Sequence, residues 1–237
     1  MTYAEWPRRV AALTQLRVAD VARPELARDD DHHLRRVLRA EDGEEIVVTN
    51  GAGSWSICEV GPVSINRLTP VYEDPAPVAT TLYMAPLKGD RSELVVAKAT
   101  ELGITTIVPL LSARIAVKFK GDVRDKNLAR WQRIADEACG QCRRTYDVTI
   151  AEPVAPSQVP LSVAVADFDG VPNWEGITAV AIGPEGGWDD GEWPSDQTKR
   201  SLGPTVLRAE TASIVAASLL AFTNGSWGFT ASSRDVG

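Results

Sequence analysis

An apolar segment, a helix-like segment and a second apolar segment follow one another directly from residue 81. TLYMAPL at 81–87 and ITTIVPLL at 104–111 have the composition of buried strands. Between them, DRSELVVAKATELG at 90–103 has the acidic start and the terminal glycine of a helix. Two strands joined by a helix form the unit from which parallel sheets are built. The sequence therefore predicts an α/β fold for this part of the chain.

The segments that follow continue the alternation of helices and strands. We predict a helix at 123–142, strands near 161–167 and 177–182, a short helix within 189–199, a short strand and loop at 202–207, and a closing helix at 210–224. The tail at 228–237 is expected to be loose.

The first 73 residues follow a different pattern. Three aspartates at 29–31 precede HHLRRVLRA, which predicts a short capped helix with its arginines largely off the apolar face. Residues 44–73 contain strand-like runs that are separated by glycine-rich hairpin turns. We predict a small β-rich domain at 1–73, a linker in EDPAPVAT, and an α/β domain at 74–237.

Composition favours a globular protein. The chain has 237 residues, of which 44% are hydrophobic and 24% charged, enough for one large domain or two modest ones. No apolar run has membrane-spanning length, and the N-terminal residues lack a signal-peptide core. We therefore expect a cytoplasmic protein with no membrane partner.

Charge is distributed unevenly along the chain. The formal net charge of −7 argues against a nucleic-acid partner, but residues 1–40 carry eight arginines against six acids. Residues 111–146 carry nine basic residues against four acids. An RNA backbone responds to such local clusters, although solvated helix faces would give the same pattern.

The cysteines and histidines do not predict a metal site. Cys139 and Cys142 form a single CxxC pair without the second pair that a four-ligand zinc site needs, and they lie at the end of a predicted helix, where redox pairs are unusual. Adjacent His32 and His33 would diverge on a helix. The three cysteines do not form a disulfide framework, so we expect structural roles and no metal.

Two glycine-proline loops follow predicted strands. The first is AIGPEGGW at 181–188, and the second is LGPTVLRAETA at 202–212. Neither is a P-loop or a GxGxxG turn, and each could be only a tight turn in an α/β core. Together, at neighbouring strand ends, they predict a ligand site, because open α/β sheets bind ligands there. Their few cations favour a ligand with an aromatic ring and positive charge over a polyphosphate.

This pair of motifs resembles the RsmE family of SPOUT (trefoil-knotted) methyltransferases. The resemblance covers nearly the whole chain, including HHLRRVLRAEDGEEIVV, KGDRSELVVAKATELG and RWQRIADEACGQCRR. It implies an N-terminal PUA-like RNA-binding β-barrel and a C-terminal knotted α/β domain that dimerises. It also implies S-adenosylmethionine as cofactor. The implied target is N3 of a uridine, conventionally numbered 1498, in the 16S ribosomal RNA of the assembled small ribosomal subunit.

The resemblance assigns roles to individual residues. It implies cofactor binding by Ile182, Gly183, Pro184, Glu185, Gly186, Gly187, Leu202, Gly203, Val206, Leu207, Thr211 and Ala212. The chemistry of uracil N3 makes Arg208 and Arg144 candidates for stabilising the uracil anion. The basic segments, together with the resemblance, predict RNA contacts by Arg35, Arg36, Arg39, Lys118, Lys120, Gln141 and Arg144. Two positions depart from the family pattern, which usually has an acidic residue at Gly140 and a small one at Arg143. Glu192 stands near a position where the family has an acid.

Other functions remain open on the sequence alone. A same-fold enzyme could methylate a ribose 2′-hydroxyl or a guanine N1, and a non-catalytic RNA-binding ribosome-assembly factor could keep the same fold. A nicotinamide-dependent dehydrogenase is disfavoured because its fingerprint is absent. Arg208 could also have a purely structural role, capping a helix or pairing with Glu210.

Overall fold

The computed structural model describes residues 5–225, so the tail predicted to be loose lies outside the described residues. The chain divides into two compact units. The first consists of Met1–Ala76 together with Asp136–Asp147, and the second of Pro77–Ala135 together with Val148–Gly237. The predicted division at residue 73 did not anticipate that residues 136–147 would join the first unit.

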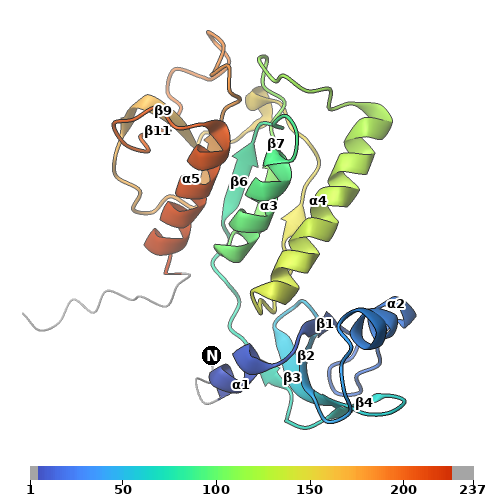
Figure 1. The fold of residues 1–237 in the computed structure, drawn as a ribbon. Helices are drawn as coiled ribbons and strands as arrows, with labels where there is room; N and C mark the ends of the chain where they lie inside the picture. Colours follow the sequence, from blue (N-terminus) through green and yellow to red (C-terminus); the bar gives the residue numbers. More distant parts are fainter. Residues whose placement is uncertain (1–4, 226–237) are drawn as a thin grey trace, which may run out of the picture. The chain divides into compact units, whose positions relative to one another are not determined.

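The first unit is built around one mixed sheet (Figure 1). Its elements are α1 (Trp6–Ala11), β1 (Gln15–Arg17), α2 (Arg28–His32), the π-helical turn η2 (His33–Val37), β2 (Glu45–Thr49), β3 (Ser54–Val60), β4 (Ile65–Arg67) and β5 (Tyr72–Glu73). The strands run in the order β1-β2-β3-β4, and β5 also pairs with β3. β1 is parallel to β2, and the remaining pairs are antiparallel.

The predicted basic helix of this unit is present, but its start and its end differ from the prediction. The three aspartates lie in the first turn of α2 rather than at its cap, which is Ala27. The segment then continues as the π-helical turn and stops at Arg39, whose φ of 56° is in the left-handed region. A left-handed residue is a common way to end a helix.

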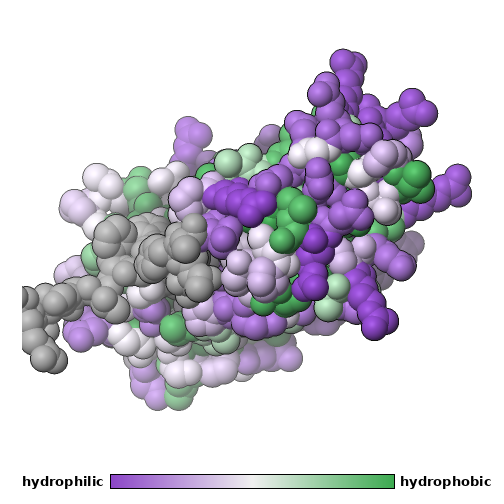
Figure 2. Space-filling model, turned by 90° about the horizontal axis from the view of Figure 1, so that it is seen from below, coloured by the Kyte–Doolittle hydropathy of each residue, from purple (hydrophilic) through white to green (hydrophobic). Residues whose placement is uncertain are grey.

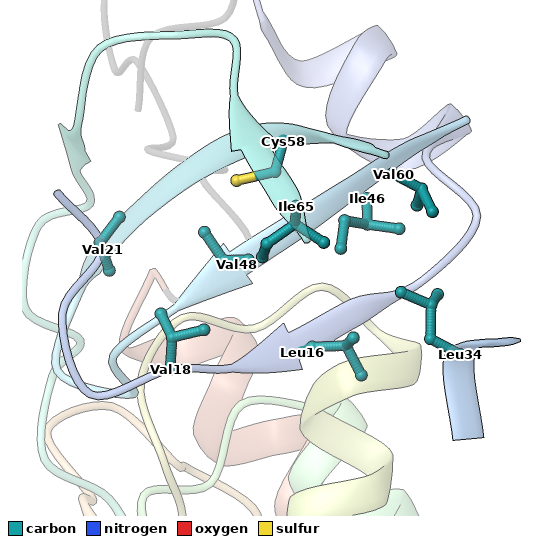
Figure 3. Packing of buried hydrophobic residues seen from close by; sticks show 9 residues of the cluster. All are labelled: Leu16, Val18, Val21, Leu34, Ile46, Val48, Cys58, Val60 and Ile65. Atoms are coloured by element: carbon teal, nitrogen blue, oxygen red, sulfur yellow. The ribbon is translucent and has the colours of Figure 1, made fainter. Parts of the chain in front are cut away.

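The core of the first unit lies between its strands and the η2 turn. Figure 3 shows apolar side chains from β1, β2, β3 and β4 pointing toward one another, with Leu34 beside them. The cluster comprises Leu16, Val18, Val21, Leu34, Ile46, Val48, Cys58, Val60 and Ile65. Burial raises the pKa of the Cys58 thiol to about 12. Cys58 is therefore a small core residue that stays protonated near neutral pH.

A buried charged cluster ties residues 136–147 to the rest of the first unit. The Asp74 carboxylate accepts hydrogen bonds from Arg9 at 2.8 Å, from the Trp55 indole at 3.1 Å and from the Thr145 hydroxyl at 2.8 Å. The Arg9 side chain is 2% exposed and stacks on the Trp55 ring at 4.5 Å from its centroid. Arg9 also donates to the carbonyl of Arg143. Both charges of the pair are thus compensated.

Removing Asp74 should destabilise the first unit strongly. Asp74→Ala leaves the buried Arg9 guanidinium without its carboxylate, a change that typically costs roughly 3–5 kcal/mol. Urea denaturation followed by tryptophan fluorescence measures the loss. Asp42→Ala is the control, because Asp42 is exposed, and it should change stability by at most about 0.5 kcal/mol. Equal midpoints for the two variants would contradict this account.

The second unit is a parallel sheet with helices, as predicted. Its elements are β6 (Thr81–Met84), α3 (Arg91–Glu101), β7 (Thr106–Pro109), α4 (Gly121–Gln141), β8 (Thr149–Ile150), the 3-10 turn η3 (Pro156–Gln158), β9 (Ala164–Val171), β10 (Ala179–Ile182), β11 (Lys199–Arg200) and α5 (Ala209–Thr223). The residues of α4 from Asp136 onward belong to the first unit. The strand order is β11-β9-β10-β6-β7-β8, and every pairing is parallel. Gly103, with a φ of 99°, follows α3 as its predicted stop.

Register places the ends of the central strands side by side. β10 pairs with β6 from Ala179↔Thr81 to Ile182↔Met84, and with β9 on its other edge. Helices α3 and α5 pack against each other, and α5 also packs on β10 and β6 (Figure 1). The loop after β10 and the segment before α5 therefore leave the same region of the sheet.

Two secondary-structure predictions for this unit are wrong. Residues 189–198 form turns rather than a short helix, and 202–207 are irregular rather than a strand. Gly191, with a φ of 74°, and Pro194 interrupt helical backbone in the first segment. The strand at this edge is β11, which is formed earlier, by Lys199 and Arg200.

The surface mixes residue types. On the face shown in Figure 2, hydrophilic side chains protrude among smaller hydrophobic areas. Within residues 5–225, no helix combines the length and the apolar character needed to cross a bilayer.

Candidate functional site

A cavity of about 560 Å³ lies at the carboxyl edge of the sheet in the second unit. Three segments line it. They are residues 166–168 of β9, Ile182 at the end of β10 with the loop that follows it, and residues 201–203 and 205–209 with Ala212 at the start of α5. Parallel sheets place ligand sites at this edge because successive loops meet there.

Most residues that the sequence assigned to a cofactor come together in this cavity. The lining contains Ile182, Gly183, Pro184, Glu185, Gly187, Leu202, Gly203, Val206, Leu207 and Ala212. Gly186 and Thr211 are not part of it. A side chain at Gly186 would meet Arg114, with its Cβ 3.3 Å from the Cβ of Arg114. Thr211 is exposed on α5.

Backbone conformation explains two of the glycines in the loops. Gly203 has a φ of 122° and Gly187 a φ of 70°, in the region that favours glycine. A Cβ added to Gly203 would have no atom within 4 Å, so this backbone borders open space. The second loop thus presents bare backbone to the cavity, as its sequence suggested.

One wall of the cavity was not predicted from the sequence. Ala166, Asp167 and Phe168 line it from β9, and Trp188 lines it from the first loop. The Trp188 indole donates to the carbonyl of Ala166 at 3.2 Å, which fixes the loop to β9. The available signal was that ADFDG ends a predicted strand at the same sheet edge as the glycine loops.

Arg91 joins the two motif segments. Its guanidinium lies 2.7 Å from the Glu185 carboxylate in the first loop and 3.8 Å from Glu210 in α5. Its Nε also donates to the carbonyl of Lys88 at 3.0 Å. Glu185, which the sequence offered as an available carboxylate, is therefore already paired.

The outer part of the first loop is held by the segment after β7. The Glu192 carboxylate accepts from the amides of Ala113 at 2.6 Å and Asp189 at 2.9 Å. Arg114 donates to the Gly186 carbonyl at 3.2 Å and to Asp189 at 2.7 Å. Glu192 thus shapes the loop and does not line the cavity.

Arg208 is an available cation at the cavity. It precedes α5, lines the cavity and is exposed. Arg208 occupies the N-cap position of α5, where its carbonyl accepts from the amide of Ala212 at 2.8 Å. Its side chain forms no capping hydrogen bond, and within residues 5–225 it forms no ion pair. Glu210, the partner considered from the sequence, lies beside Arg91 instead. The structural roles considered for the Arg208 side chain are therefore not observed.

Arg144 belongs to the first unit. Gln15 donates to its carbonyl oxygen at 2.6 Å, and burial lowers the pKa of its guanidinium from the usual arginine value. Arginine remains charged even so. Its proposed catalytic role stays a prediction.

The predicted RNA-binding residues differ in exposure. Arg36, Arg39, Lys118, Lys120 and Gln141 are exposed. Arg35 instead donates to Asp31 at 2.8 Å and to the Gly61 carbonyl at 3.0 Å, so it holds the η2 turn against the sheet. RNA contact by any of these residues stays a prediction.

Gly140 and Arg143, near the end of α4, both contact the segment at residues 12–15. Arg143 has a φ of 62°, and its guanidinium donates to the carbonyls of Gly140 at 2.9 Å and Ala12 at 2.5 Å. A Cβ at Gly140 would lie 3.2 Å from the carbonyl oxygen of Gln15. Among the described residues, no group of three or more His, Cys, Asp or Glu side chains could hold a metal ion.

Comparison with known proteins connects this geometry to a family. Residues 74–221 match the family described as RNA methyltransferase domain, and residues 26–65 match the RNA methyltransferase PUA domain. The chain belongs to the ribosomal RNA small subunit methyltransferase E family. A member from Aquifex aeolicus is 32% identical over 78% of this chain and 88% of its own. One from Bacillus subtilis is 26% identical over 89% and 94%.

Solved structures of methyltransferases are similar to this chain. A methyltransferase from Legionella pneumophila, solved with bound cofactor SAM, superposes with a TM-score of 0.76 at 29% identity, covering 87% of this chain and 96% of that one. The small subunit methyltransferase E of Neisseria gonorrhoeae, bound to S-adenosyl methionine, has a TM-score of 0.73 at 24% identity and covers 86% of this chain and 94% of its own. The latter supports the fold.

Loss of the Arg91 guanidinium should loosen the first loop. Arg91→Met leaves Glu185 and Glu210 without their shared cation, so backbone amides at 183–188 should exchange hydrogen faster. Hydrogen-exchange mass spectrometry measures this. Lys98→Met is the control on the same helix, because Lys98 forms an exposed pair with Glu101 at 2.8 Å and such pairs contribute little. Unchanged exchange in the loop of Arg91→Met would refute the role of Arg91.

Proposed function

We propose that this protein is an S-adenosylmethionine-dependent methyltransferase that modifies N3 of a uridine in 16S ribosomal RNA, at the position numbered 1498. The observation that carries the proposal is the cavity that gathers both glycine loops and an available arginine at the edge of a parallel sheet. Relatives named ribosomal RNA small subunit methyltransferase E support the RNA substrate.

The cavity fits the cofactor. Its volume of about 560 Å³ falls within the range of roughly 300–1,000 Å³ that is usual for small-molecule sites. Gly203 supplies open backbone, Phe168 and Trp188 supply aromatic surface, and Asp167 supplies a hydrogen-bond acceptor. When bound, S-adenosylmethionine supplies an electrophilic methyl group on a positively charged sulfur.

The chain must then make a poor nucleophile reactive. N3 of uracil carries a proton and becomes nucleophilic as that proton leaves, and the base must be extruded to reach a cavity. Arg208 stands at the cavity with its guanidinium uncommitted. A preorganised cation stabilises negative charge that develops on the uracil as it is deprotonated. We assign this role to Arg208, and to Arg144 as a second candidate.

Arg208→Ala should separate chemistry from cofactor binding. Turnover should fall by roughly 10² or more, the scale of losing one preorganised donor. The affinity for S-adenosylmethionine should change far less. Single-turnover methylation of small-subunit RNA and calorimetric titration of the cofactor measure the two quantities. A parallel collapse of affinity would show that Arg208 grips the cofactor instead.

Gly203→Leu should block the cofactor. Its side chain would project into the open space beside the cavity and weaken binding by roughly tenfold or more. Gly176→Leu is the matched control, since Gly176 has a φ of 72° and open space but does not line the cavity. Calorimetry compares the two variants after circular dichroism confirms folding. Equal affinities would remove the second loop from the binding site.

The first unit is proposed to hold RNA through its phosphates. Arg36 and Arg39 are the residues to test, because Arg35 has a structural role. Changing both to glutamine should flatten the log–log salt dependence of RNA affinity by roughly one unit for each phosphate interaction that the change removes. S-adenosylmethionine binding should be unchanged. Equal RNA affinity and slope at several salt concentrations would exclude these arginines.

The resemblance to the RsmE family also supports proposals about the knot, the oligomeric state, the form of the substrate and the location. The second unit is inferred to be knotted and to form a homodimer, the substrate to be the RNA within the assembled small subunit, and the location to be the cytoplasm. Glutaraldehyde cross-linking and sedimentation would address the dimer.

One experiment tests the function itself. Uridine methylation is mapped on 16S RNA from cells that lack the protein, and again after return of the wild type or of Arg208→Ala. Methylation should disappear and be restored only by the wild type. Unchanged methylation without the protein would overturn the proposed activity, and full restoration by Arg208→Ala would remove Arg208 from the chemistry.

A further inference from the structure

The wall of the cavity formed by β9 departs from regular strand geometry. β11 pairs with β9 at Lys199↔Val165 and then at Arg200↔Val171, so residues 166–170 of β9 lie in a bulge between two consecutive pairs. Bulges re-aim side chains and are frequent beside active sites. The bulge carries Asp167 and Phe168, both of which line the cavity.

Close backbone contact allows the bulge. A Cβ on Gly170 would lie 2.3 Å from the backbone carbon of Arg200, which is closer than two such atoms can approach. Only glycine allows the β9 backbone to approach β11 this closely. The close contact at Gly170 therefore accompanies the register shift next to Asp167.

Lys199 holds the Asp167 carboxylate in place. Its Nζ lies 2.8 Å from Oδ2 of Asp167, whose side chain is 22% exposed. Burial alone would raise the pKa of Asp167, but the Lys199 hydrogen bond and charge and the amides of Asp169 and Phe168 outweigh it, so the pKa lies below the usual value. Asp167 is thus ionised at neutral pH and oriented from two sides.

The ion pair with Lys199 determines which kind of ligand group the Asp167 carboxylate can bind. The Asp167–Lys199 pair has no net charge, so it attracts a cationic sulfonium or ammonium only weakly. A carboxylate has about four acceptor sites, and the ammonium and the two amides leave capacity for one more donor. The site therefore fits a neutral hydroxyl, and carboxylates at the ends of parallel strands bind ribose hydroxyls in other folds.

We propose that Asp167, positioned by Lys199, accepts a hydrogen bond from a ribose hydroxyl of the nucleoside part of the cofactor. The inference rests on the proposed function. It makes Asp167 a residue that selects ribonucleoside over deoxyribonucleoside ligands, with Phe168 beside it as apolar surface.

The test measures hydroxyl recognition directly. S-adenosylhomocysteine and its 2′-deoxy and 3′-deoxy analogues are titrated calorimetrically into the wild type, Asp167→Asn and Asp169→Asn. Asp169 is the control, because it is exposed on the same bulge and does not line the cavity. For the wild type, one analogue should bind more weakly by about tenfold to a hundredfold, as expected for a hydrogen bond to a charged group.

The variants should differ in how strongly they distinguish S-adenosylhomocysteine from its deoxy analogues. Asp167→Asn should weaken S-adenosylhomocysteine itself and bind the critical deoxy analogue almost as well as the parent ligand. Asp169→Asn should discriminate as the wild type does. Lys199→Met should weaken the parent ligand less than Asp167→Asn does and keep part of the discrimination, because the acceptor remains but is no longer held.

Each contrary outcome has a distinct meaning. A wild type that binds neither S-adenosylmethionine nor S-adenosylhomocysteine overturns both the proposed function and this inference. A wild type that binds the parent ligand and both analogues equally overturns the inference alone, whatever the variants do. Full discrimination in Asp167→Asn likewise assigns the hydroxyl contact to another residue.

Discussion

The backbone hydrogen bonds of β10 set the arrangement of the second unit. Because β10 pairs in parallel with β6 on one edge and β9 on the other, the carboxyl ends of three strands lie together. The loop that follows Ile182 and the bulge of β9 can therefore line one cavity, although they come from different parts of the chain. α5 then packs on β10 and β6, which brings the segment before it to the same edge. A one-residue slip of β10 would exchange its two faces and separate these walls.

The charges around the cavity are arranged differently from what the loops alone suggest. Read from the sequence, carboxylates in lysine-poor loops favour a cationic ligand. In the structure, Glu185 is paired with Arg91, and Asp167 is paired with Lys199. The two carboxylates therefore hold neighbouring segments in place, and neither is an unpaired charge. Arg208, which also lines the cavity, has no such partner among the described residues.

The features predictable from the sequence are those encoded within single segments. The alternation at 81–111 and the glycine-proline loops each depend on nearby residues, and both were found where expected. The β9 wall was missed because its bulge depends on the register with β11, about thirty residues later. The short helix expected within 189–199 was wrong because Gly191 and Pro194 interrupt it, and Glu192 accepts instead from the amide of the distant Ala113. Gly186 faces Arg114, from a distant segment, and does not line the cavity, so its contact with the cofactor stays a prediction.

Helix α4 contributes residues to both units, which its continuous helical sequence pattern does not reveal. The helix is uninterrupted through Gln141, yet residues from Asp136 onward belong to the first unit. What places them there is contact with α1 and β1, since Arg143 donates to Ala12 and Gln15 donates to Arg144. A Cβ at Gly140 would lie 3.2 Å from the Gln15 carbonyl oxygen, so a larger residue would need this contact to widen by a few tenths of an ångström. Arg144, which follows the end of α4, is held in the first unit by its contact with Gln15. Gly140 and Arg143 thus belong to one local contact, in which Arg143 supplies hydrogen bonds and Gly140 leaves room for β1.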